Sequence, residues 1–314
     1  MANPGSKEAD HLSRFKAHIQ LLRPPLAAMD LAMPAASALL ASYAVSGSLP
    51  ALLPFILATV GAYCAITSSY VYNDCCDIDV DLLAMPNRPL PSMRLEKREA
   101  QRWSLILFFA AAVVALYLNP ESFATLIAAT FIITLYSSWA KRNTPFSWGF
   151  VGLAFGLVPF GVWLAIEPAG ILMPGAGIHP ASVLLALMIC ITDWGFTNCD
   201  ASRDVEGDKA NGIPTNPAIY GIPATSKMVA IFWFMGVALS LALGFSAGLG
   251  LIYLAAAVAA GGWLLIQNLD FVRHPTAKRG DHLFYQSANY RAVLFAAIII
   301  DILLRTAIPS LSFL

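Results

Sequence analysis

Charged side chains are scarce in this sequence of 314 residues. Lysine, arginine, aspartate and glutamate together make up 12% of the chain, whereas hydrophobic residues make up 58%. An ordinary soluble domain is roughly 25% charged. The shortage of charge excludes an ordinary soluble domain. Long apolar stretches recur over the whole length, which indicates one large domain, residues 1–314, embedded in a membrane.

Several other features are missing. There are five cysteines, and two of them, Cys75 and Cys76, are adjacent; this poor disulfide framework suggests a reducing, cytoplasmic environment. The five histidines show no spacing typical of zinc ligands, so we expect no zinc site. Residues 1–22 are polar and lack the apolar core of a signal peptide, so we expect a cytoplasmic N-terminal segment. The net charge of zero gives no indication of a nucleic-acid partner, and we expect none.

Apolar stretches long enough to cross a bilayer recur nine times. A spanning helix needs ~20 largely apolar residues, and only a backbone with internal hydrogen bonds is tolerated in the hydrocarbon layer. The sequence therefore predicts an all-α integral membrane protein with nine transmembrane helices in one bundle. The predicted spans are residues 25–46, 50–72, 101–118, 122–140, 147–166, 180–198, 225–245, 248–269 and 288–308.

Positively charged residues follow a one-sided pattern along these spans. Eighteen of the 19 lysines and arginines lie in the N-terminal segment or around the segments that follow even-numbered spans, and Arg305 is the exception. Because positive residues are retained in the cytoplasm, we expect the N-terminus inside and the C-terminus outside. The long polar segments 73–100, 199–224 and 270–287 then share the cytoplasmic side. That arrangement favours chemistry at this membrane surface over a polar path through the bilayer.

The first acidic cluster directly follows the second predicted span, in the stretch NDCCDIDVD. Read as a helix, Asn73, Asp77 and Asp81 are spaced i, i+4, i+8 and share one face, and Asp74 flanks them. Like charges this close repel, and a bound divalent cation would relieve the repulsion. Carboxylate and carboxamide oxygens are ligands that Mg²⁺ prefers, often together with substrate phosphates. The alternative is an ordinary solvated acidic loop.

A second acidic cluster leaves the sixth predicted span as the first leaves the second. In DASRDVEGDKANGIPT, Asp200, Asp204 and Asp208 have the same i, i+4, i+8 spacing. This repetition indicates a pseudo-repeat of two halves, each with an acidic motif. Two such faces on one side of the membrane, with Mg²⁺ between them, would clamp a diphosphate.

Basic and phenolic side chains near the two clusters complete this predicted clamp. They are Arg88 after the first cluster, Lys209 after the second, and Tyr136 and Lys141 at the end of the fourth span. Arg88 stands between prolines in NRPLPS, and a guanidinium in a rigid loop suits phosphate contact. For Lys141 and its neighbour Arg142, anchoring at the membrane surface is an equally good explanation.

Together these motifs resemble the UbiA superfamily of intramembrane prenyltransferases. NDCCDIDVD fits the pattern NDxxDxxxD, NRPLPS fits the proline-rich run after it, and DASRDVEGDKANGIPT fits DxxxD with its trailing glycine and threonine. The resemblance covers most of the chain, including LLRPP before the first span. It implies Mg-dependent transfer of a prenyl group from a prenyl diphosphate to a hydrophobic acceptor in the lipid bilayer. The acceptor would be aromatic, quinone-like or a lipid.

The resemblance also implies roles for individual residues. Two Mg²⁺ ions on the diphosphate would be held by Asn73, Asp77, Asp81, Asp200 and Asp204, with Asp74 and Asp208 at matching motif positions. The diphosphate would be contacted by Arg88, Tyr136, Lys141 and Lys209. Of these residues, the expected catalytic ones are Asp77, Asp204, Tyr136 and Lys141. The chain departs from the family at Met93, where a glycine often follows PLPS.

One further acid, Asp193, lies inside the sixth span. It precedes Asp200 by seven residues, which places both on nearly the same helix face. Because an acid within a span is costly and usually functional, we predict that Asp193 also acts in catalysis and orients or deprotonates the acceptor. Pairing with a residue of another span is the alternative.

Two other functions compete with transfer to an acceptor. A terpene cyclase of the same superfamily would act on a prenyl diphosphate alone, because the substrate's own double bonds would attack the cation. A transporter could also present acidic loops, but it would have no need to repeat them beside basic partners.

Overall fold

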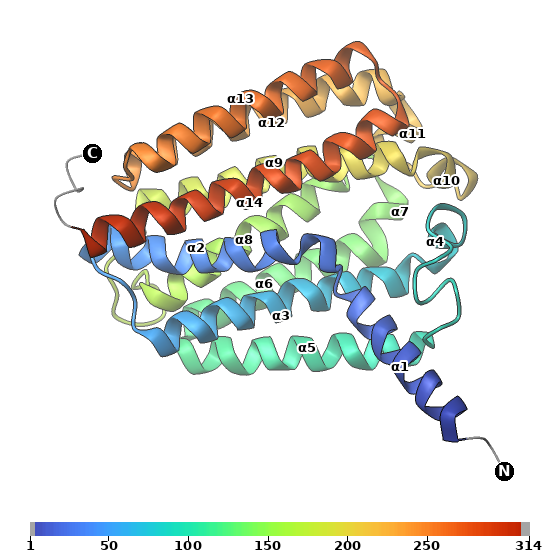
Figure 1. The fold of residues 1–314 in the computed structure, drawn as a ribbon, viewed down its shortest axis with the longest axis horizontal. Coiled ribbons are helices and arrows are strands. Elements are labelled where there is room, and N and C mark those ends of the chain that lie inside the picture. Colours follow the sequence, from blue (N-terminus) through green and yellow to red (C-terminus); the bar gives the residue numbers. More distant parts are fainter. Residues whose placement is uncertain (1–3, 309–314) are drawn as a thin grey trace.

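The computed structural model describes residues 4–308, and every regular element in that range is helical (Figure 1). Nine helical stretches in this range are long and apolar enough to cross a membrane. They are Pro24–Ser46 (η1, α2), Leu52–Cys76 (α3), Lys97–Leu118 (α5), Pro120–Asn143 (α6, η2, α7), Trp148–Ile166 (α8), Pro180–Arg203 (α9), Ile222–Ser246 (α12), Leu251–Arg273 (α13) and Ala277–Ala307 (α14). The predicted all-α fold with nine spans is confirmed.

The N-terminal helix and four short helices gather at one end of the bundle. They are α1 (Pro4–Leu21), α4 (Ile78–Ala84), α7 (Lys141–Asn143), α10 (Val205–Ala210) and α11 (Asn216–Tyr220). Figure 1 shows them at the right, whereas α14 ends at the opposite side of the bundle. The other pieces of the compound spans are η1 (Pro24–Leu26), α2 (Ala27–Ser46), α6 (Pro120–Leu135) and η2 (Tyr136–Ala140). The C-terminus, predicted to lie outside, falls beyond the described residues.

Two polar segments are more helical than the sequence indicated. The N-terminal segment forms α1, in which Ala17 and Leu21 are buried in a small apolar cluster with Val71 and Leu95. The segment 270–287, predicted to connect two spans, is mostly helix, because α13 continues to Arg273 and α14 already begins at Ala277. Both helices continue into polar residues beyond the hydrocarbon layer, and hydropathy alone does not identify such residues as helical.

A single residue separates the third and fourth spans. Asn119 caps α6, because its side-chain oxygen accepts a hydrogen bond from the Ser122 N–H (2.8 Å), and Pro120 occupies the first helical position. The Asn119 amide also donates to the Leu164 carbonyl of α8 (2.7 Å). Capping by asparagine and proline at the first position both favour a helix start.

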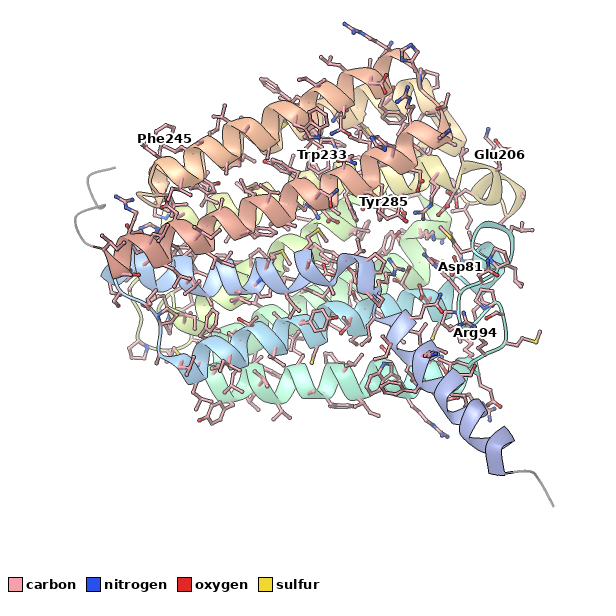
Figure 2. The ribbon with its side chains drawn as sticks, in the orientation of Figure 1. Asp81, Arg94, Glu206, Trp233, Phe245 and Tyr285 are labelled. Atoms are coloured by element: carbon pink, nitrogen blue, oxygen red, sulfur yellow. The ribbon has the colours of Figure 1, made fainter. Side chains whose placement is uncertain are left out.

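Apolar side chains cover the outside of the bundle as well as its interior. Phe109, Phe131 and Phe245 are more than 60% exposed, whereas Trp233 and Phe295 are completely buried. Figure 2 shows Phe245 on the periphery and Trp233 between helices. A water-facing surface would not present such side chains, so the exposed apolar belt is a lipid-facing one.

Candidate active site

The first acidic motif forms a helix that breaks at its central aspartate. Asp77, between the end of α3 and the start of α4, has φ −108° and ψ 17°. The Asp77 N–H still donates to the Asn73 carbonyl (3.0 Å), and the Asp81 N–H donates to the Asp77 carbonyl (2.8 Å). The continuous helix suggested by the spacing is therefore interrupted, but the i to i−4 bonding keeps the three side chains on one side.

The second motif repeats this geometry. Asp204 lies between α9 and α10 with φ −93° and ψ 9°. Its N–H donates to the Asp200 carbonyl (3.2 Å) and its carbonyl accepts from the Asp208 N–H (3.0 Å). The same break in both halves is the structural counterpart of the predicted pseudo-repeat.

Two arginines neutralise the outer carboxylates of the first motif. Arg88 lies 2.8 Å from Asp81 and 3.4 Å from Asp74, and Arg23 lies 2.9 Å from Asp74. The structure thus places Arg88 among the aspartates of the first motif. Arg23 was counted only as a cytoplasmic positive charge, although its position in LLRPP could have marked it. Burial raises the pKa of Asp81 to about 6, and the charge of Arg88 opposes this rise.

Lys141 reaches the centre of the first motif. Its ammonium lies 2.6 Å from Asp77 Oδ2, while Asp77 Oδ1 is buried and has no hydrogen-bond partner. Lys141 follows η2, which is a π-helical turn, and such turns are frequent at functional sites. The adjacent Arg142 bonds Asp79 (2.7 Å), and this hydrogen bond and charge lower the Asp79 pKa. Both basic residues therefore contact the motif directly.

Arg203 occupies the corresponding place in the second motif. It lies 2.6 Å from Asp200 and 2.9 Å from Asp204. Its position inside DASRD, three residues after one aspartate and next to the other, was the signal that sequence reasoning missed. Asp208 accepts a hydrogen bond from Thr215 (2.8 Å).

The two motifs face each other across basic side chains. Helices α4 and α10 pack against each other. Burial raises the pKa of Asp208 to about 6, and the charge of Lys141, which bonds Asp77 of the other motif, opposes that rise. Burial also raises the pKa of Asp204, and Arg88 is among the charges that oppose it. Both cations thus act on both halves.

Two adjoining chambers lie beside the motifs. The inner chamber, about 630 Å³, has a mixed lining: apolar and aromatic side chains of several helices stand beside Asn73 and the charged Arg23, Asp193, Asp200 and Arg291. The outer chamber, about 430 Å³, is polar and is lined by Lys141 and the three aspartates of the second motif. Tyr136, Thr197 and Asp200 belong to both walls. Figure 2 shows Asp81 and Glu206 at the same end of the bundle.

Lys209, one of the predicted diphosphate contacts, lies away from the two chambers. Its side chain is about half exposed and lies 4.0 Å from Glu206. It is not among the residues that line either of the two chambers.

Asp193 is paired within the membrane. It accepts a hydrogen bond from Arg291 of α14 (2.9 Å), and both side chains are less than 5% exposed. Arg291 also donates to Thr192 (3.0 Å) and lies over the ring of Phe196. The pairing alternative is what the structure shows, and Asp193 lines the inner chamber as well.

The fold and site define a class: membrane-embedded helical proteins with two acidic motifs at one mouth of an apolar interior. Comparison with known proteins makes the assignment. The model of the UbiA prenyltransferase family matches residues 31–296. The chain belongs to this family and is a prenyltransferase of the integral membrane type.

Individual relatives agree with this assignment. A protoheme IX farnesyltransferase of Rhodopseudomonas palustris is 31% identical, over 81% of this chain and 80% of the relative. A digeranylgeranylglyceryl phosphate synthase of Thermococcus kodakarensis is 27% identical, over 90% and 97%.

Solved structures share the fold. The apo UbiA homologue of Aeropyrum pernix superposes with a TM-score of 0.72 at 22% identity, over 87% of this chain and 97% of that one. A UbiA homologue of Archaeoglobus fulgidus, solved with GPP and Mg²⁺, has a TM-score of 0.57 at 18% identity, over 90% and 99%.

Proposed function

We propose that the protein transfers a prenyl group from a prenyl diphosphate to a hydrophobic acceptor within the membrane, with Mg²⁺ held by the two acidic motifs. One observation carries the proposal. Two aspartate motifs from separate halves face each other with Lys141 and Arg88 between them, next to the inner chamber and to an adjoining apolar cavity between α3, α5, α6 and α8. A molecule with an anionic head and an apolar tail fits this combination.

The residues present fit a hard divalent cation. The donor set is carboxylate and carboxamide oxygen, which Mg²⁺ prefers. The buried Oδ1 of Asp77 has no partner. Among residues 4–308, no three acidic, histidine or cysteine side chains stand close enough to hold a cation as they are. Arg23, Arg88, Lys141 and Arg203 bond the carboxylates instead.

Binding of the substrate would then exchange partners at the site. The motif residues Asn73, Asp77, Asp81, Asp200 and Asp204 would hold the metal, which would supply positive charge to the diphosphate. Arg88 and Lys141, released from Asp81 and Asp77, would turn to the phosphate oxygens. Hydrogen-bond donors aimed at a leaving group are worth most where its negative charge grows, in the transition state.

Other residues of the chamber would protect and orient the reacting carbon. Breaking the carbon–oxygen bond leaves an allylic cation on the prenyl group and both electrons on the diphosphate. Tyr136, on the wall between the chambers, would place its aromatic face near this cation. Aromatic and apolar side chains around the cation would keep water away from it, so the acceptor would attack the cation and then lose a proton.

The acceptor can be identified by a direct comparison of candidate compounds. The relatives are a protoheme IX farnesyltransferase and a digeranylgeranylglyceryl phosphate synthase, which points to protoheme IX or a glyceryl phosphate lipid as acceptor. Either would be assayed with the purified protein in liposomes, beside a reaction with prenyl diphosphate alone. A cyclic product without any acceptor would identify the cyclase instead.

The test of the proposal is release of diphosphate from geranylgeranyl or farnesyl diphosphate in Mg²⁺. We expect Asp77→Ala and Asp204→Ala to abolish it. Glu206→Ala, which removes a highly exposed carboxylate of the same segment, should leave it unchanged. Full activity in both aspartate variants would refute the proposed site.

A further inference from the structure

The membrane-spanning part of the bundle holds a buried acid that the acidic motifs do not explain. Asp30 lies in α2, and its side chain is completely buried. An ionisable side chain inside a span is costly and usually functional. The Tyr70 hydroxyl of α3 donates to both carboxylate oxygens of Asp30, at 3.2 Å and 3.1 Å. The two residues therefore form a pair that joins two spans.

Tyr70 connects this acid to the inner chamber. Tyr70 lines the chamber, whereas Asp30 is not among the described residues that line it. On α3, Tyr70 precedes Asn73 of the first motif by three residues, which is about ~4.5 Å along the helix axis. Tyr70 thus lies about one turn from the first motif on the side of the bilayer interior, where an acceptor would lie next to the reacting carbon.

Neighbouring side chains hold the Tyr70 ring in place. The guanidinium of Arg23 lies over the ring, 4.6 Å from its centroid, and also bonds Asp74 of the first motif at 2.9 Å. The ring of Phe155, from α8, stacks with Tyr70 at a centroid distance of 6.2 Å. Because these contacts limit the movement of the ring, its hydroxyl is positioned in advance for a ligand in the chamber.

Asp30 differs from the other buried acid of the chamber region in its partner. Arg23 and Arg291 act on Asp30 through their charge. Each of these arginines forms an ion pair with another acid, Asp74 and Asp193 respectively, at 2.9 Å. Asp193 therefore has a guanidinium on its carboxylate, whereas the hydrogen bonds that Asp30 accepts from the described side chains come from a phenol. Of the two acids, Asp30 is the better placed to take up a proton.

The Tyr70 hydroxyl can pass a proton between a ligand and this acid. A phenol has one proton to donate and lone pairs that can accept a second hydrogen bond. The proton of Tyr70 is directed at Asp30. Its lone pairs can then accept a hydrogen bond from the hydroxyl of a ligand in the chamber.

We propose that Tyr70 and Asp30 together take up the proton that the acceptor loses, and that the acceptor presents a hydroxyl to Tyr70. The inference rests on the proposed function and extends it to the acceptor. The acceptor oxygen bonds C1 of the prenyl group, and the bond from C1 to the diphosphate breaks with both electrons left on the diphosphate. The acceptor's hydroxyl proton passes to the Tyr70 oxygen while the proton of Tyr70 passes to Asp30. When the ether product leaves, Asp30 returns the proton through Tyr70 to water.

The experiment follows three products of one reaction: diphosphate, the prenylated acceptor and the free prenyl alcohol. It uses the full chain in liposomes with Mg²⁺ and geranylgeranyl diphosphate. The acceptor is a glyceryl phosphate lipid with one free hydroxyl or, in parallel, a substituted phenol. Without a group to take the acceptor's proton, water captures the prenyl cation instead, while diphosphate release, which depends on the acidic motifs, continues. The readout is therefore the ratio of prenylated acceptor to prenyl alcohol.

Asp30→Asn is the decisive variant. The asparagine carbonyl oxygen can still accept the hydrogen bond of Tyr70, so a purely structural link between α2 and α3 is kept, but the amide cannot take up the proton. We expect the ratio to fall by about a hundredfold, as on loss of a general base, with diphosphate release nearly unchanged. Tyr70→Phe keeps the ring and should lower the ratio in the same way. Tyr63→Phe removes a hydroxyl of the same helix that does not line the chamber, and should leave the ratio unchanged.

A further variant guards against a general effect on folding. Tyr70→Phe leaves the Asp30 carboxylate buried without its donor, so this variant alone can be unstable. Asp30→Leu combined with Tyr70→Phe replaces the pair with apolar side chains and should restore the unfolding temperature. The double variant should still release diphosphate, and it should form prenyl alcohol in place of the prenylated acceptor.

The outcomes separate the possible failures. A wild-type ratio in Asp30→Asn would overturn the inference and leave the pair as a structural link. Equal loss of diphosphate release and of prenylated acceptor in a folded Asp30→Asn would also overturn it, because the pair would then support the diphosphate site. A wild-type protein that releases diphosphate but prenylates neither hydroxyl compound would overturn it as well, even if it prenylates protoheme IX, which has no hydroxyl. No diphosphate release by the wild-type protein would instead remove the proposed function.

Discussion

Lys141 stands where the two halves of the site meet. It bonds Asp77 of the first motif at 2.6 Å, and its charge also acts on Asp208 of the second. The sequence allowed either anchoring at the membrane surface or diphosphate contact for this lysine. Its ammonium lies inside the acidic cluster, which a lysine that merely anchors a helix would have no reason to approach.

We expect Lys141→Met to lower kcat for diphosphate release by about 10²-fold or more, because one preorganised donor to the growing negative charge is lost. KM for the donor should change less than kcat. The measurement is steady-state kinetics in liposomes, with Ser138→Ala, an exposed neighbour on the same turn, as control. Unchanged kcat would show that Lys141 only anchors the helix.

Variants of the buried pair Asp193–Arg291 can distinguish a structural role of Asp193 from a catalytic one. Removing one partner leaves the other charged and buried, which costs about 3–5 kcal/mol. We therefore expect Arg291→Met to lower the thermal unfolding temperature strongly, and Asp193→Leu combined with Arg291→Met to recover most of it.

The same double variant tests the role predicted from the sequence. If Asp193 orients or deprotonates the acceptor, the double variant should lose product formation or show a raised KM for the acceptor, even though its stability is recovered. Normal kcat and acceptor KM in that variant would assign Asp193 to structure alone.

At the scale of helices, the sequence predicted the transmembrane spans but not the helix breaks at Asp77 and Asp204. Hydropathy locates α3 and α9 because lipid requires apolar residues there, and the i, i+4, i+8 spacing located the acidic faces. Nothing in the local sequence marks Asp77 or Asp204 as a break, because the hydrogen bonds that cross it are helical ones. The ion pair of Arg23 with Asp74 depends on how the N-terminal segment approaches α3, which one sequence does not give. The pairs of Arg203 with Asp200 and Asp204 are local, so their spacing in the sequence could have indicated them.

The backbone conformation at Met93 explains why the family often has glycine at this position. Its φ of +57° lies in the left-handed region, where glycine carries no steric cost. The family's frequent glycine at this place is therefore explained by the backbone. Here methionine adopts the same conformation with its side chain almost fully exposed.

The junction of α5 and α6 gives a prediction at this scale. Asn119→Ala removes the cap of α6 and leaves the buried Leu164 carbonyl without its donor. Loss of the cap alone costs about 1 kcal/mol, and the orphaned carbonyl adds about 1–3 kcal/mol. We expect a lower unfolding temperature in detergent. Ala124→Gly, in the exposed part of the same helix, serves as a comparison for simple loss of helix propensity. An unchanged unfolding temperature in Asn119→Ala would contradict the capping role.

At the scale of the molecule, the distribution of charge implies an orientation. The short helices and both acidic motifs lie at the end of the bundle from which α1 emerges (Figure 1). Basic residues gather at that end, so we propose that it faces the cytoplasm. The substrate would then enter from the cytoplasmic side.

Labelling with a membrane-impermeant maleimide tests this orientation. Ser48→Cys lies in the exposed loop after α2, and Glu206→Cys lies at the opposite end, in α10. In intact cells we expect the first to be labelled and the second only after lysis, with the wild-type chain as background. Labelling of Glu206→Cys alone in intact cells would reverse the assignment.

The central claim is that two acidic motifs act together, through Mg²⁺, on one diphosphate. The most direct measurement is the affinity of a thio-diphosphate prenyl analogue in Mg²⁺ and in EDTA, for the wild-type protein, Asp77→Ala, Asp204→Ala and the double variant. We expect binding to be lost in EDTA and in either single variant, with the double variant no weaker than the singles, since the residues act as a unit. Tight binding in EDTA, or independent, additive losses from the two motifs, would contradict the account.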